Sequence, residues 1–104
     1  MLLEVREVSR KTALDGRLEV TEASARRLMT VPSPLQVTLD DARGEGSVVD
    51  MRCTCAKGGA AGGHHHYFVQ SALFSVLPAG ETIVLELLDG PVLSVARPHP
   101  LRPE

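Results

Sequence analysis

Aromatic side chains are scarce in this sequence of 104 residues, which has no tryptophan, one tyrosine and two phenylalanines. Proteins that hold single-stranded nucleic acid usually stack its bases on several aromatic rings. Tyr67 and Phe68 are adjacent and Phe74 is the one further ring, so the chain lacks such a stacking surface. Single-strand binding is therefore disfavoured, and the core has to be built from aliphatic side chains.

A large excess of charge is also absent. Eleven Lys and Arg residues against thirteen Asp and Glu residues give a net charge of -2 at pH 7. Strong phosphate binders are usually basic overall, so contact with nucleic acid would require a local basic patch. No segment approaches the roughly 20 apolar residues of a membrane span, and the first residues carry no apolar signal-peptide run. We expect no membrane partner.

Cysteine is limited to Cys53 and Cys55, which are separated by one residue. On a strand their Cα atoms would lie about 6–7 Å apart, since each residue adds about 3.3 Å. A disulfide across that span would be strained. Free thiols and a cytoplasmic location are the simplest expectation.

Alternating apolar residues and turn signals predict a mainly β domain with two short helices. Leu35, Val37 and Leu39 should face the core, Asp15-Gly16 should form a turn, and Thr21 should cap the first helix. We expect one domain over residues 1–97, a small open antiparallel β-barrel or pseudobarrel of about seven strands, and a proline-rich tail over 98–104. The expected strands span residues 2–8, 17–20, 35–39, 47–55, 64–69, 82–88 and 91–96, with helices after Thr21 and over 71–77 and a turn over 40–46.

Three segments carry a resemblance to a known family. They are the strand and helix over 17–28, the strand and turn over 37–44, and the stretch from Tyr67-Phe68 to Leu85. Their order resembles the B3-type DNA-binding pseudobarrel of plant transcription factors and of some restriction-enzyme recognition domains. The resemblance covers residues 17–96 and implies that double-stranded DNA is the partner.

In that family two arms grip the major groove of DNA. Carried over by position, the resemblance implies that the first arm would offer Arg6, Arg10 and Lys11, and the second arm Arg52 and Lys57. The glycine-rich segment after Lys57 would let the backbone approach a phosphate closely. Surface Arg and Lys residues are also common without any ligand, and Glu4, Glu7, Asp15 and Asp50 lie nearby in the sequence.

Cysteines and histidines flank the glycine-rich segment on both sides. If the flanking strands pair symmetrically, Cys55 lies opposite His64 and Cys53 opposite His66, with all four on one face. Two thiolates and two imidazoles are a suitable zinc ligand set. Because Met51 and Phe68 would share this face, it is alternatively a core-facing surface.

We therefore expect a non-enzymatic binding domain with double-stranded DNA as the leading ligand, and we assign no catalytic residue. A Cys–His nucleophile would need a low-pKa thiol beside a helix N-terminus or a fixed imidazole in a cleft, which a strand does not clearly provide. Two alternatives stay open. One is a zinc-binding β protein using Cys53, Cys55, His64 and His66, with zinc as its cofactor. The other is a protein-interaction or oligomerisation module, such as a homodimer through a β-edge.

Overall fold

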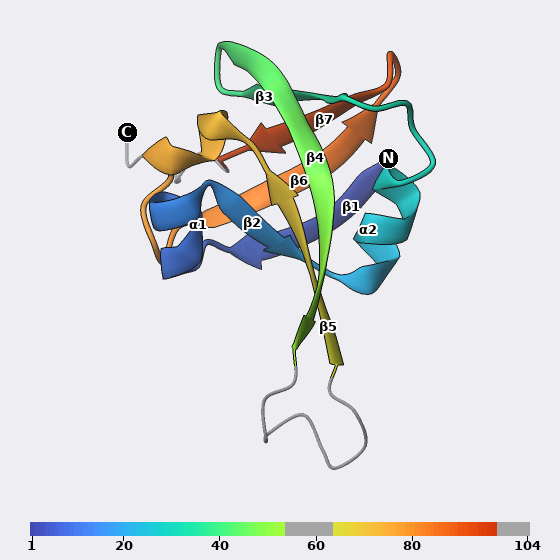
Figure 1. Cartoon of the computed structure of the whole chain (residues 1–104). Coiled ribbons are helices and arrows are strands. Elements are labelled where there is room, and N and C mark those ends of the chain that lie inside the picture. The colour runs from blue at the N-terminus through green and yellow to red at the C-terminus, as the bar shows by residue number, and fades with distance from the viewer. Residues whose placement is uncertain (54–63, 98–104) are drawn as a thin grey trace.

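The computed structural model describes residues 1–53 and 64–97. It confirms a mainly β fold, with a seven-stranded sheet in this part of the chain that is nearly closed into a barrel (Figure 1). The elements in chain order are β1 (Leu2–Glu7), α1 (Arg10–Asp15), β2 (Arg17–Val20), α2 (Glu22–Leu28), β3 (Leu35–Leu39), β4 (Ala42–Cys53), β5 (His64–Gln70), the 3-10 helix η2 (Ala72–Val76), β6 (Thr82–Leu88) and β7 (Val92–Ala96). The expected tail over 98–104 lies outside the described residues.

The strands are arranged in the order β1-β6-β7-β3-β4-β5-β2. All neighbouring pairs are antiparallel except β3 and β7, which run parallel. The sheet is therefore mixed, and the expectation of a wholly antiparallel barrel is wrong at this one pair. Alternation along a strand shows which side chains face inward, but it carries no information about which distant strand becomes the neighbour.

Strand β4 begins earlier than expected. The predicted polar turn over 40–46 is only Asp40-Asp41, since Leu39 already pairs with Ala42. Strand β4 pairs with β3 as far as Gly46 and with β5 from Ser47 onward. A Cβ atom on Gly46 would lie 2.8 Å from the Gln70 carbonyl oxygen, so the glycine permits close contact where β4 changes partner. Strand β2 pairs with the other edge of β5 from Gln70 to Tyr67, and from Met51 and His66 onward β4 and β5 alone form a two-stranded ribbon that projects from the barrel (Figure 1).

Helix α1 was not expected from the sequence. The predicted Asp15-Gly16 turn is instead its C-terminal end, where Gly16 adopts the left-handed conformation (φ 68°) and its N–H donates to the Thr12 carbonyl. Because this helix separates β1 from β2, the two strands do not form a hairpin. Strand β1 pairs with β6 and β2 pairs with β5.

The other two helical segments lie where the sequence places them. Thr21 caps α2 as predicted, with its Oγ1 accepting a hydrogen bond from the Ser24 N–H at 3.2 Å. The second predicted helix is a short 3-10 helix, η2, and it is preceded by Ser71, whose Oγ accepts from the Leu73 N–H. Phe74 and Leu77 are fully buried in this segment and close one end of the core.

The core is aliphatic apart from Phe74, as the composition requires. Leu35, Val37 and Leu39 are at most 4% exposed, which confirms their predicted inward orientation. Strand β6 lies between β1 and β7 and buries Ile83 and Leu85 completely, so it is a central strand. The remaining apolar members of the core are Val8, Leu18, Val20, Ala25, Leu28, Val69, Leu77, Leu93 and Val95.

Side chains bridge the gap between β1 and the β2–α2 segment, where the barrel lacks a backbone ladder. Glu4 Oε1 accepts hydrogen bonds from the Thr21 N–H and Oγ1 (2.9 Å each) and from Ser24 Oγ (2.5 Å). Arg6 bridges the same gap, because its Nη1 donates to the Glu19 carbonyl and its Nε lies 2.8 Å from Glu4 Oε2. Burial alone would raise the pKa of Glu4, but these hydrogen bonds and the Arg6 charge outweigh burial and lower that pKa.

Candidate functional site

A half-open hollow of about 340 Å³ lies between α1 and the base of the β4–β5 ribbon. We call it the basic hollow. Four elements, α1, β2, β4 and β5, contribute to its walls, and three of its lining residues are lysine or arginine. The lining residues are Lys11, Asp15, Arg17, Met51, Arg52, His66 and Phe68.

The strand registers explain how the lining residues of β2, β4 and β5 come together, except for Arg52, which is opposite His65 on the other face of the ribbon. Arg17 pairs with Gln70 on one side of β5, while Met51 pairs with His66 on the other side. Alternation then places His66 and Phe68 on the face that carries Met51. Phe68 is 3% exposed and Met51 is 40% exposed. The core residues Leu18 and Val69 lie on the opposite face, so the expectation that the face of Met51 and Phe68 points to the core is wrong, although Phe68 itself is buried.

Two of the cations make specific contacts with apolar groups in the hollow. The Lys11 ammonium lies 5.7 Å from the centre of the Phe68 ring, within the range of a cation–π contact. Arg17 Nη1 lies 3.3 Å from Met51 Sδ, a weak acceptor. These contacts hold both side chains against the wall without neutralising their charges.

Arg17 differs from the other half-buried arginines in the described ranges. Arg6 has a carboxylate partner in Glu4, and Arg97 has partners in Glu81 and Asp40. No carboxylate pairs with Arg17 in the part of the chain that the structure describes, and its Nε is buried without a hydrogen-bond acceptor. The positive charge of Arg17 is therefore available to a ligand that enters the hollow.

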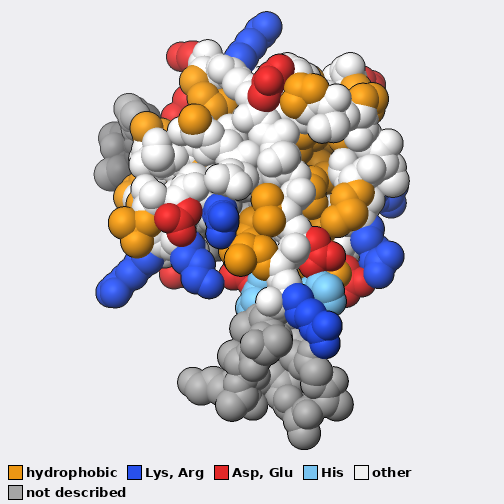
Figure 2. Space-filling view, viewed as in Figure 1, with side chains coloured by type: hydrophobic (Ala, Val, Ile, Leu, Met, Phe, Trp, Pro, Cys, Tyr) orange, Lys and Arg blue, Asp and Glu red, His pale blue; other side chains and the backbone are white. Residues whose placement is uncertain are grey.

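Most of the acids near the ribbon base are engaged with histidines. Asp50 Oδ1 lies 2.6 Å from His65 Nδ1, and Glu19 Oε2 lies 3.0 Å from His66 Nδ1. Asp15 is the one acid in the lining itself. Figure 2 shows the resulting surface, with Lys and Arg side chains on both sides of the ribbon base, a histidine at each side and acids beside them.

The structure brings together two of the five cations predicted to contact DNA. Lys11 and Arg52 both line the basic hollow. Arg6 lies instead in the seam between β1 and β2, and Arg10 is exposed on α1 without lining the hollow. Lys57 lies outside the described residues. The sequence analysis missed Arg17 as a site residue because it reads as an ordinary polar position on a strand.

The Cys–His pairing differs from the expected register. Cys53 is paired with His64, and His66 is opposite Met51, so the ladder is shifted by two residues from the prediction. A two-residue shift preserves the alternation of faces, which is why the sequence pattern could not distinguish the two registers. Cys55 lies outside the described residues. Among the side chains that the structure describes, no three His, Cys, Asp or Glu residues are grouped to hold a metal ion, and the zinc site stays a prediction.

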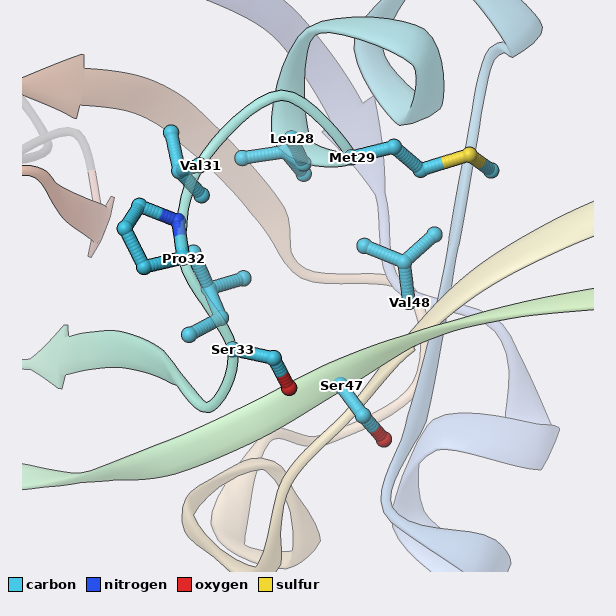
Figure 3. A pocket seen from close by; sticks show the side chains of 8 residues that line it. Leu28, Met29, Val31, Pro32, Ser33, Ser47 and Val48 are labelled. Atoms are coloured by element: carbon cyan, nitrogen blue, oxygen red, sulfur yellow. The ribbon is translucent and has the colours of Figure 1, made fainter.

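Two other hollows are less suited to a charged ligand. One of about 200 Å³, shown in Figure 3, lies between the end of α2, the segment after it and β4, with Leu28, Met29, Val31 and Val48 among its walls. This volume is below the usual range of ligand pockets, which begins near 300 Å³. The other, of about 350 Å³, is lined by one cation and one acid, Arg43 and Asp89, so their charges balance.

Comparisons with models of protein families, with curated proteins and with solved structures found no match for this chain. No helix in the described part is long and apolar enough to span a membrane. The function must therefore be inferred from the geometry of the hollow and the ribbon.

Proposed function

We propose that the protein binds double-stranded DNA, with the β4–β5 ribbon directed to the major groove and the basic hollow holding the phosphate backbone. The observation that carries the proposal is that three cations surround the ribbon base: Lys11 and Arg17 on the face of the hollow, and Arg52, which borders the hollow, at a position on the opposite face of β4. These residues come from three different elements, and only Asp15 opposes them in the lining. A chain with a net charge of -2 thereby presents a local positive surface.

The ribbon supports the same proposal by its shape. The major groove of B-DNA is about 12 Å wide and admits a two-stranded β-ribbon. The ribbon of β4 and β5 projects from the barrel (Figure 1). The three cations lie at its base, where the phosphates that border the groove would lie. Phosphate contacts at the base would position the ribbon, while base contacts would come from the ribbon itself.

A titration of a fluorescent duplex of about 20 base pairs tests this proposal. If the protein makes three phosphate contacts, the logarithm of its association constant should fall linearly with the logarithm of the salt concentration, with a slope of about -2.7. The affinity should then fall roughly 40-fold between about 50 and 200 mM salt. The Lys11→Gln/Arg52→Gln double variant should bind at least roughly tenfold more weakly at the lower salt concentration and should lower the slope to about -0.9.

Arg43→Gln is the matched control for charge. Arg43 is an exposed arginine near the opposite end of β4, so its removal changes the net charge without altering the hollow. The affinity of the Arg43→Gln variant for duplex DNA should stay within about twofold of that of the wild type. Absence of duplex binding at low salt, or equal weakening by the control variant, would rule out the proposed function.

A further inference from the structure

We propose that the basic hollow holds one phosphate group at Arg17, which binds it directly through its guanidinium, while Lys11 and Arg52 contact the phosphates on either side. The inference rests on the proposed function, which it deepens by naming the residue that anchors the backbone. The same chemistry would accept a phosphate from DNA or a free phosphate ion. Arg17 is not among the cations that the sequence and the family resemblance single out.

The donor groups of Arg17 are the first argument. A guanidinium has five N–H donors, and a thioether sulfur is a weak acceptor that satisfies little of this capacity. Arg17 Nη1 contacts Met51 Sδ at 3.3 Å, and the buried Nε has no acceptor within the described residues. A half-buried cation in this state is costly unless an anion enters. Phosphate matches a guanidinium because its oxygens accept two parallel N–H bonds.

The remaining walls suit the same phosphate backbone. Lys11 is held over the Phe68 ring at one side of the hollow, and Arg52 lines the hollow from β4. The volume of about 340 Å³ lies near the lower end of ligand pockets, so the hollow suits a phosphate and the sugar attached to it better than a larger ligand. The backbone beneath Arg17 is fixed, because Thr12 is fully buried and its Oγ1 donates to the Arg17 carbonyl at 2.9 Å.

Three other features of the described residues are weaker candidates for a ligand site. The Glu4–Thr21–Ser24 cluster is satisfied within itself and holds the barrel seam. The hollow beside Arg43 is balanced by Asp89, and the hollow of Figure 3 is small. The basic hollow is distinguished from these by Arg17, whose buried Nε has no hydrogen-bond acceptor in the described structure.

Inorganic phosphate is the probe for the first arm of the test. At constant ionic strength, phosphate added to the wild-type protein should shift the Arg17 Nε–H resonance in a ¹H–¹⁵N spectrum, together with the amides of Lys11 and Phe68. Replacement of phosphate by chloride should leave these resonances in place. This readout uses the unaltered protein, so it does not depend on a variant that folds. If phosphate causes no shift at Arg17, the inference is wrong.

Variants supply the second arm. Arg17→Gln should abolish the phosphate response and weaken duplex affinity at least roughly tenfold. Arg17→Lys, which keeps the charge but loses the planar fork, should show an intermediate affinity. The Arg27→Gln variant loses one positive charge on α2, outside the hollow, and should bind phosphate and duplex DNA as the wild type does.

The two proposals can fail separately. Phosphate binding at Arg17 without duplex binding would uphold the phosphate site and overturn the DNA function. Duplex binding that is unaffected by Arg17→Gln would uphold the DNA function and overturn the role of Arg17.

Discussion

Glu4 shows how a single side chain completes the barrel. Its side chain is 11% exposed, and one of its oxygens accepts three hydrogen bonds from Thr21 and Ser24. The other oxygen lies 2.8 Å from Arg6 Nε. The charged form of Glu4 therefore joins β1 to the start of α2, where no backbone ladder connects the two edges of the sheet.

Glu4→Gln should lower the free energy of unfolding by about 1–3 kcal/mol at neutral pH, because hydrogen bonds to a charged acceptor are lost. The folded-state pKa of Glu4 is lowered, so its contribution is present above the ordinary glutamate pKa of about 4.3 and is lost as pH falls through the lowered value. Urea denaturation near neutral pH and near pH 3 measures both effects. The difference between variant and wild type should shrink in acid.

Glu45→Gln is the matched control, since Glu45 is exposed on β4. The Glu45→Gln variant should change the free energy of unfolding by no more than about 0.5 kcal/mol at both pH values. A Glu4→Gln effect that is equally small, or that grows in acid, would contradict the assigned role of Glu4.

Arg17 shows what a residue-level reading of the sequence leaves out. Its position on a half-buried strand was predictable from the alternation of Leu18 and Val20. Its place in a hollow with Lys11 and Arg52 was not, because that depends on β5 lying between β2 and β4. Lys11 and Arg52 entered the prediction through a family resemblance, and both border the same hollow in the structure.

At the scale of elements, the junction between α1 and β2 holds the helical wall of the basic hollow. Gly16 has a left-handed backbone (φ 68°), and a Cβ atom there would lie 2.8 Å from the Ser71 carbonyl oxygen. The Gly16 carbonyl also accepts the Ser71 N–H at 2.9 Å. Helix α1 is thus fixed against the chain that follows β5.

Gly16→Ala should destabilise the protein by about 1–2 kcal/mol because alanine is disfavoured in the left-handed conformation. The close contact of the added Cβ atom with Ser71 should add a further loss of stability. Gly80→Ala is the matched control, because Gly80 also has a positive φ (91°) but nothing lies within 4 Å of its Cβ position. Chemical denaturation of both variants compares the two losses. Equal losses would show that the close approach at Ser71 is unimportant.

Most strands were predictable, because Leu35–Leu39 and Arg17–Val20 alternate and Thr82–Leu88 carries apolar residues on both faces. Helix α1 was missed for a physical reason: it buries Thr12 and leaves Leu14 82% exposed, which reverses the usual amphipathic pattern. Its capping positions, Ser9 and Gly16, were the signals that could have revealed it.

Two further features were not predicted for a different reason. They are the parallel pairing of β3 with β7 and the two-residue shift in the register between β4 and β5. Both preserve the alternation of each strand, so a pattern of faces is compatible with either arrangement. The partner and the register are decided by packing across the whole core, which no local segment contains.

For the whole molecule, charge is distributed unevenly. The net charge of -2 would repel DNA weakly at long range, while Lys11, Arg17 and Arg52 would attract a phosphate at close range. Binding should therefore be localised at the ribbon base and strongly dependent on salt.

The most direct measurement is a map of amide chemical-shift changes when the wild-type protein is titrated with a DNA duplex at low salt. The account predicts that the changes cluster on α1, Arg17, and the described parts of β4 and β5, and that they disappear as salt rises. Changes confined to β3, β7 or the Arg43 end of β4, or no changes at all, would contradict it.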